Sequence, residues 1–211
     1  MEVLSIQEEQ RIFEAKLELT LQWKDSLVEF HNLKPKTQDN LLTLDEQLSL
    51  WTPTLFFRNS KEELVTVNDE AALMNIRREG KGMISENSVT EVKEVYPGSE
   101  NSIIMSRIYS AQFYCDYTAA WYPFNDPACQ VELVLDNSLG LQHGYINYTG
   151  ARELSDYIVK TWNITTNNNY AVTISITMGR KVLGFFLTIY FSYIFMNHAL
   201  IHFSTDIGNI H

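Results

Sequence analysis

Basic side chains are in short supply in this sequence. Its 211 residues contain 16 lysines and arginines against 26 aspartates and glutamates, so the formal net charge is -10 at pH 7. A nucleic-acid partner requires lysine and arginine gathered on one face, where they neutralise phosphates. We therefore expect no nucleic-acid binding.

Short motifs of the common catalytic sites are also absent. The sequence contains no Gly-rich phosphate loop, no Gly-x-Ser-x-Gly and no His-Glu-x-x-His. His198 and His202 are four residues apart and would share a helix face, but no third metal ligand accompanies them. Polar contacts with neighbouring helices are the alternative for this pair. We expect neither an enzyme nor a bound cofactor or metal ion.

Cysteine is scarce, since only Cys115 and Cys129 occur, with thirteen residues between them. A disulfide that closes this loop would stabilise the fold by about 3 kcal/mol. The spacing favours the disulfide, and two free buried cysteines that never meet are the alternative.

A secretory signal peptide is not visible, because Met1 to Ser5 leads into charged residues rather than an apolar run. The start is therefore interpreted as a truncated or processed end. Sequons begin at Asn147 and at Asn163, which makes both asparagines candidate glycosylation sites. Together with a disulfide they favour an oxidising, extracellular setting.

Alternation of apolar and polar side chains predicts strands in several places. Residues 12–23 alternate most clearly, and the pattern recurs over 102–115, 131–135 and 172–178. A period of two is typical of a half-buried strand. Residues 62–100 are the least informative, and we predict short strands and loops there. Several short strands separated by turns indicate a β-sandwich.

One long apolar run departs from this pattern. Residues 182–203 contain no acidic or basic side chain apart from two histidines, and about twenty such residues can cross a bilayer as a helix. Arg180 and Lys181 directly before the run suit the membrane interface. A buried core helix is the alternative. The length, the basic flank and the position after the last strand favour a membrane span.

The segment from Cys115 to Cys129, called the cysteine loop below, carries a more specific pattern. It contains Tyr122-Pro123-Phe124-Asn125 at its centre. The loop resembles the signature loop of the Cys-loop pentameric ligand-gated ion channels. Asn125 stands where the family usually has Asp, and Pro127 stands where it usually has Gln. Asp126 is placed to replace part of the missing charge.

Further motifs follow in the order of that family. Trp23-x-Asp25 at the end of the second strand is similar to a family hallmark. Trp51-x-Pro53, followed by aromatics and Asn59, resembles the family's Trp-x-Pro-Asp segment, with Thr54 in place of Asp. Arg180 precedes the apolar run, as an arginine precedes the first membrane helix of the family.

The resemblance implies an all-β, immunoglobulin-like β-sandwich of about ten strands, followed by one transmembrane helix. Residues 1–180 would be the extracellular ligand-binding domain, 181–204 the first membrane helix, and 205–211 the start of an intracellular or linker segment. The implied function is a subunit of a neurotransmitter-type channel in the plasma membrane. A ligand bound at subunit interfaces would gate its pore. The alternative is a soluble or single-pass binding or adhesion module of the same sandwich fold without a pore.

The implied partners are a small-molecule agonist, the other subunits of a homo- or heteropentamer, and the lipid bilayer. Carrying the family's binding loops over to this sequence gives these candidate ligand-binding residues: Phe56, Phe57, Arg58, Asp136 and Tyr170 on one side of the interface, and Glu18, Ile104 and Ser106 on the other. Arg58 would attract a carboxylate and Glu18 an ammonium, so an amine or an amino acid would suit the site. The alternative is that both charges face solvent or pair at a subunit interface.

The resemblance also implies a coupling surface next to the membrane. Glu8, in the turn between the first two strands, would form an ion pair with Arg180. An ordinary exposed turn carboxylate is the alternative for Glu8, and Glu9 is an equally close competitor. The pair would act together with the aromatic-proline run of the cysteine loop, Tyr122, Pro123 and Phe124.

Overall fold

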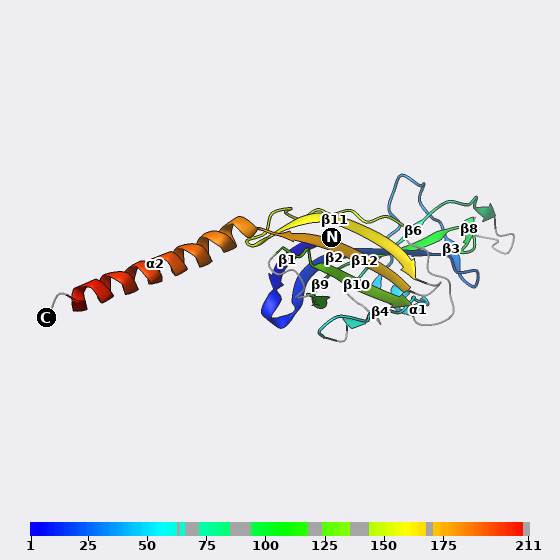
Figure 1. The fold of residues 1–211 in the computed structure, drawn as a ribbon. Coiled ribbons are helices and arrows are strands. Elements are labelled where there is room, and N and C mark those ends of the chain that lie inside the picture. Colours follow the sequence, from blue (N-terminus) through cyan, green and yellow to red (C-terminus); the bar gives the residue numbers. More distant parts are fainter. Residues whose placement is uncertain are drawn as a thin grey trace.

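The computed structural model shows a β-rich body with a long helix extending from one end (Figure 1). It describes residues 1–62, 64–65, 72–84, 94–117, 124–135, 144–167 and 171–208. Side chains are described in these ranges except at residues 64, 65, 167, 185 and 197–208.

Strands dominate the described residues, as the alternation predicts. The elements in chain order are β1 (Glu2–Gln7), η1 (Glu8–Gln10), β2 (Ile12–Trp23), β3 (Glu29–His31), α1 (Leu44–Ser49), β4 (Leu55–Phe57), β5 (Leu64–Val65), β6 (Leu73–Arg77), β7 (Met83–Ile84), β8 (Glu94–Pro97), β9 (Ser102–Asp116), β10 (Ala128–Leu135), β11 (Tyr157–Asn167), β12 (Ala171–Arg180) and α2 (Val182–Gly208). The predicted sandwich-like, all-β body is confirmed.

The main sheet folds into two layers at the disulfide. Strands β1, β2, β9 and β6 form the first layer, and β10, β12, β11, β4 and β5 form the second. In the described residues the strands of the two layers pair through β9 and β10, which share two residue pairs, Cys115↔Cys129 and Asp116↔Ala128. The turn after β4 also bridges to β9, at Ser60↔Phe113. The inner faces of the two layers enclose the main apolar core. Within it, the ring of Phe57 on β4 lies 5.3 Å from the ring of Tyr109 on β9.

Strand β2 shows how the sequence sets this arrangement. It pairs antiparallel with β9 from Ile12↔Tyr114 to Trp23↔Ile103 without a register shift. Phe13, Ala15 and Leu17 are buried, whereas the alternating polar residues face out. Burial of every second side chain fixes the register, because a slip by one residue would turn the apolar set towards solvent.

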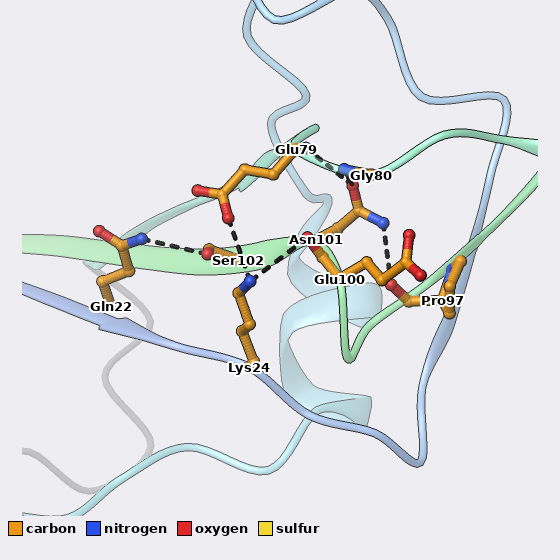
Figure 2. A network of polar contacts seen from close by, with 8 residues as sticks. All are labelled: Gln22, Lys24, Glu79, Gly80, Pro97, Glu100, Asn101 and Ser102. Atoms are coloured by element: carbon orange, nitrogen blue, oxygen red, sulfur yellow. Dashed lines mark hydrogen bonds and ion pairs between the residues drawn. The ribbon is translucent and has the colours of Figure 1, made fainter.

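A polar network holds together the end of the sandwich away from α2 (Figure 2). The fully buried Asn101 side chain accepts hydrogen bonds from the backbone amides of Glu79 (2.9 Å) and Gly80 (3.1 Å). It also donates to the carbonyl of Pro97 at 2.8 Å. Lys24, directly after β2, forms an ion pair with Glu79 at 3.2 Å. One amide side chain thus satisfies three backbone groups, two in the segment after β6 and one at the end of β8.

Helix α2 begins at Val182, two residues after the end of β12. Many of its described apolar side chains are exposed, among them Leu183, Leu187 and Phe191. A search of the described residues finds no helix that combines the length and the hydropathy of a membrane span. The helix itself is therefore present, but the membrane span expected over residues 181–204 is not confirmed.

Helix α1 was not predicted from the sequence. Thr43 caps it: the Thr43 hydroxyl accepts a hydrogen bond from the Glu46 amide at 3.4 Å, and the Glu46 carboxylate accepts one from the Thr43 amide at 2.7 Å. Reciprocal bonds of this kind satisfy amides that have no partner within the helix. The short helix leads into Trp51, whose side chain is exposed rather than buried.

Candidate functional site

A disulfide between Cys115 and Cys129 closes the cysteine loop, with the two Cα atoms 4.6 Å apart. Both cysteines are buried in the main core. The amide of Cys115 also donates to the carbonyl of Arg11 at 2.8 Å, which ties β9 to the turn between β1 and β2. The disulfide prediction is confirmed, and the alternative of two separate thiols is excluded.

Glu8 in η1 and Arg180 at the end of β12 form a bidentate ion pair. Arg180 Nη1 donates to Glu8 Oε2 at 2.6 Å, and Arg180 Nη2 donates to Glu8 Oε1 at 2.5 Å. Parallel bonds of this geometry are the strongest form of a charge-assisted contact. The Arg180 side chain is 8% exposed and that of Glu8 is 31% exposed, so the pair is largely withdrawn from water. The carboxylate predicted for this contact is therefore Glu8 rather than its neighbour Glu9.

Tyr157 completes the cluster. Its hydroxyl donates to Glu8 Oε2 at 2.7 Å, and the guanidinium carbon of Arg180 lies 5.1 Å from the centre of its ring. Tyr157 is also the cross-strand partner of Arg180 in the pairing of β11 with β12. The ion pair is thus positioned by three elements: η1, the start of β11 and the end of β12.

Protonation states follow from this environment. The hydrogen bonds from Arg180 hold the pKa of Glu8 below its ordinary value, although burial acts in the opposite direction. Burial raises the pKa of Tyr157, and it raises the pKa of the nearby Tyr117 to about 12. At neutral pH Glu8 is therefore ionised and both phenols are neutral, which leaves the Tyr157 hydroxyl able to donate to the carboxylate.

Phe124 connects the cysteine loop to α2. Its ring is 63% exposed, and its centre lies 5.7 Å from that of Phe186 in the second turn of the helix. The two other residues predicted for this surface, Tyr122 and Pro123, lie outside the described residues. The described part of the coupling surface thus contains the ion pair, Tyr157 and this aromatic contact.

The second set of predicted ligand-binding residues lies on the outer face of the first layer. Glu18 on β2 is paired across the ladder with Ile108, and the next outward positions pair Thr20 with Ser106 and Gln22 with Ile104. The hydroxyls of Thr20 and Ser106 are 3.1 Å apart. Glu18, Ser106 and Ile104 therefore share one face, as the resemblance implies.

In the first set of predicted ligand-binding residues, Phe56 and Arg58 are exposed but Phe57 is buried. Phe56 is 39% exposed on β4, and Arg58 follows in an exposed turn with its amide bonded to the carbonyl of Glu132 at 2.9 Å. Phe57 is only 3% exposed and packs in the core against Tyr109. Adjacent residues of a strand point to opposite faces, so Phe56 and Phe57 cannot both meet a ligand. Phe57 is corrected to a core residue.

Asp136 and Tyr170 lie outside the described residues. Both glycosylation candidates, Asn147 and Asn163, are exposed. Asn163 lies on β11, an edge strand of the second layer. Attachment of a glycan at either position stays a prediction.

The described members of the two ligand-binding sets lie on different faces of the chain. Phe56 and Arg58 belong to the second layer and point away from the core, whereas Glu18 and Ser106 point outward from the first layer. The outer faces of two packed layers are directed away from each other. Phe56 and Arg58 therefore lie on a different outer face from Glu18 and Ser106.

Comparison with protein families gives a match over most of the chain. Residues 1–174 match the family described as the neurotransmitter-gated ion-channel ligand binding domain. The matched range contains the disulfide, Glu8 and both candidate ligand-binding faces, and it ends before Arg180 and α2. A search of curated proteins gives no significant match.

Proposed function

Because the chain belongs to the neurotransmitter-gated ion-channel ligand-binding domain family, we propose that it serves as the ligand-binding domain of a pentameric channel subunit. The agonist is bound between adjacent subunits, and its binding is transmitted through the disulfide end of the sandwich to a pore. Residues 1–180 lie outside the cell in this proposal, and the chain has no enzymatic role.

The observation that carries the interface proposal is the separation of the candidate residues. Each chain presents an exposed aromatic and arginine, Phe56 and Arg58, on one layer and a carboxylate, Glu18, on the other. Neighbouring copies in a ring bring the first face of one chain against the second face of the next. Such an arrangement offers a cation and an anion to one small molecule, which favours an amino acid as the ligand.

The transmission proposal is supported by the contacts at the start of α2. Arg180, which binds Glu8, lies two residues before the start of α2. Phe124 packs against Phe186, which lies within the helix. A displacement of β12 or of the cysteine loop would therefore reach α2 directly. The exposed apolar side chains of α2 support its placement in a lipid bilayer, where they would be solvated by lipid chains.

Arg58→Ala tests the binding proposal against a panel of amino acids and the matching simple amines. We expect amino acids to bind about tenfold or more weakly, because a charged hydrogen bond contributes about 1.5–3 kcal/mol. Simple amines, which carry no carboxylate, should bind to the variant and to the unchanged protein with similar affinity. Isothermal titration calorimetry gives both values.

Arg152→Ala is the matched control for this experiment. Arg152 is also an exposed arginine, but its backbone carbonyl accepts from Val159 near the disulfide end of β11, whereas β4 pairs with the opposite end of β10. Equal amino-acid affinity of Arg58→Ala and the unchanged protein would remove Arg58 from the site.

A further inference from the structure

Strand β11 contains a bulge at Lys160. Its register with β12 runs to Val159↔Met178 and resumes at Thr161↔Thr177, so Lys160 has no cross-strand partner. Both Lys160 and Thr161 are exposed, whereas the strand otherwise alternates. A bulge adds one residue to a strand and redirects its side chain. The redirected side chain here is a lysine.

Gly179 on β12 leaves room for the redirected lysine. A Cβ atom at position 179 would lie 2.2 Å from Lys160 Cε and 2.9 Å from Lys160 Nζ. The backbone of Gly179 has no positive φ angle, so conformational freedom does not explain the glycine. The lysine stem therefore crosses β12 directly above the one residue type that does not obstruct it.

The ammonium group of Lys160 reaches the cysteine loop. Its Nζ donates to Asp126 Oδ1 at 2.7 Å and to Asp126 Oδ2 at 2.6 Å. In the next residue of the loop, the carbonyl of Pro127 accepts from the amide of Met178 at 3.0 Å. Asp126 thus lies where the loop returns to the sheet. The adjacent hydrogen bond from Met178 to Pro127 can serve as a measure of how stably the loop is attached to β12.

We propose that Lys160 is a positioning residue that fastens the carboxyl-terminal end of the cysteine loop to the β11–β12 hairpin, so that hairpin and loop move together. The contact is separate from the Glu8–Arg180 pair, which ties β12 to the turn at η1. Asp126 thereby gives this loop a charged anchor one residue beyond Asn125. The consequence for signal transmission rests on the proposed function, but the contact itself does not.

Exchange of the Met178 amide with solvent, followed by NMR, tests the contact. Lys160→Gln should speed this exchange roughly two- to fivefold, the range expected for the loss of an exposed ion pair. The amide of Cys115, which bonds to Arg11 on the η1 side, should keep its rate. Lys160→Arg should restore most of the protection at Met178.

Gly179→Ala provides a second variant that removes neither charge. The new methyl group would collide with the flexible end of Lys160 rather than with the backbone, so the lysine moves and the fold is kept. We expect the Met178 amide to exchange as it does in Lys160→Gln. In the Lys160→Gln background the glycine substitution should add nothing.

Three results would overturn the proposal: an unchanged Met178 rate in Lys160→Gln, an equal increase at Met178 and Cys115, or additive effects of the two substitutions. The measurement needs no agonist. A chain that binds no small molecule would refute the proposed function and still show whether this anchor exists.

Discussion

Replacing Cys115 and Cys129 together by alanine is expected to lower the free energy of unfolding by about 3 kcal/mol. The bond joins the two layers where β9 pairs with β10, and it closes a loop with a sequence separation of 14. Its loss enlarges the conformational freedom of the unfolded chain. Alanine is preferred to serine because both positions are buried and a hydroxyl there would add an unsatisfied polar group. Urea unfolding followed by tryptophan fluorescence gives the value.

Reduction of the unchanged protein is the control for that experiment. The reduced protein should unfold at nearly the same urea concentration as the double variant, since both lack the same covalent link. An unchanged midpoint in both samples would show that the disulfide does not contribute to the stability of the sandwich.

Arg180→Ala is expected to cost about 2–3 kcal/mol, somewhat less than the 3–5 kcal/mol of a fully buried pair because Glu8 is 31% exposed. The substitution leaves the Glu8 carboxylate with the Tyr157 hydroxyl but without its compensating charge. Glu8→Arg combined with Arg180→Glu should recover most of the loss, since the two charges exchange places. Thermal unfolding of Arg180→Ala and of the charge-exchanged double variant, each compared with the unchanged protein, measures the loss and the recovery.

Glu9→Gln is the matched control, because Glu9 is the exposed neighbour of Glu8 in the same turn. It should leave the stability unchanged within about 0.5 kcal/mol. A charge-exchanged variant no more stable than Arg180→Ala would reject the pair as a specific contact.

The Glu8–Arg180 pair also makes the free energy of unfolding depend on pH. The native pKa of Glu8 is lowered, so its contribution is complete above the unfolded value near 4.5 and is lost as the pH falls through the native pKa. Between pH 5 and the acid limit, the unchanged protein should lose more stability than Glu8→Gln. Parallel pH profiles of the two proteins would contradict this assignment.

Periodicity alone predicts the strands that are straight and half-buried. The alternation over residues 12–23 coincides with β2, which pairs with β9 without a break. Strand β11 was not recognised in this way, because the bulge at Lys160 shifts its apolar positions from Tyr157 and Val159 to Trp162 and Ile164. One extra residue is enough to hide a strand from a period of two.

Helix α1 was not predicted from the sequence for a different reason. Its six residues are too few for helical periodicity to show, and none is buried. The signal was local: Thr43 followed three residues later by Glu46 is the sequence of a capping box. Chemistry at the ends of an element can therefore reveal what its apolar pattern does not.

The part of the candidate site that could be predicted from the sequence is the ion pair, where the family resemblance is supported by two opposite charges. The family resemblance implied an ion pair between Glu8 and Arg180, and the bidentate contact confirms that pairing. Tyr157 was missed because its place opposite Arg180 depends on the register of β11, which the bulge obscures. Phe57 was assigned to the ligand although its neighbour Phe56 already occupied the outward position on β4.

Cross-linking of Arg58→Cys, Glu18→Cys tests most directly whether neighbouring chains form the ligand-binding interface. The two native cysteines are joined in the disulfide, so only the introduced thiols react with a bifunctional thiol reagent. In detergent extracts the double variant should give a ladder on a non-reducing gel that ends at five chains, while each single variant stays monomeric. A double variant that remains a single chain would contradict the account.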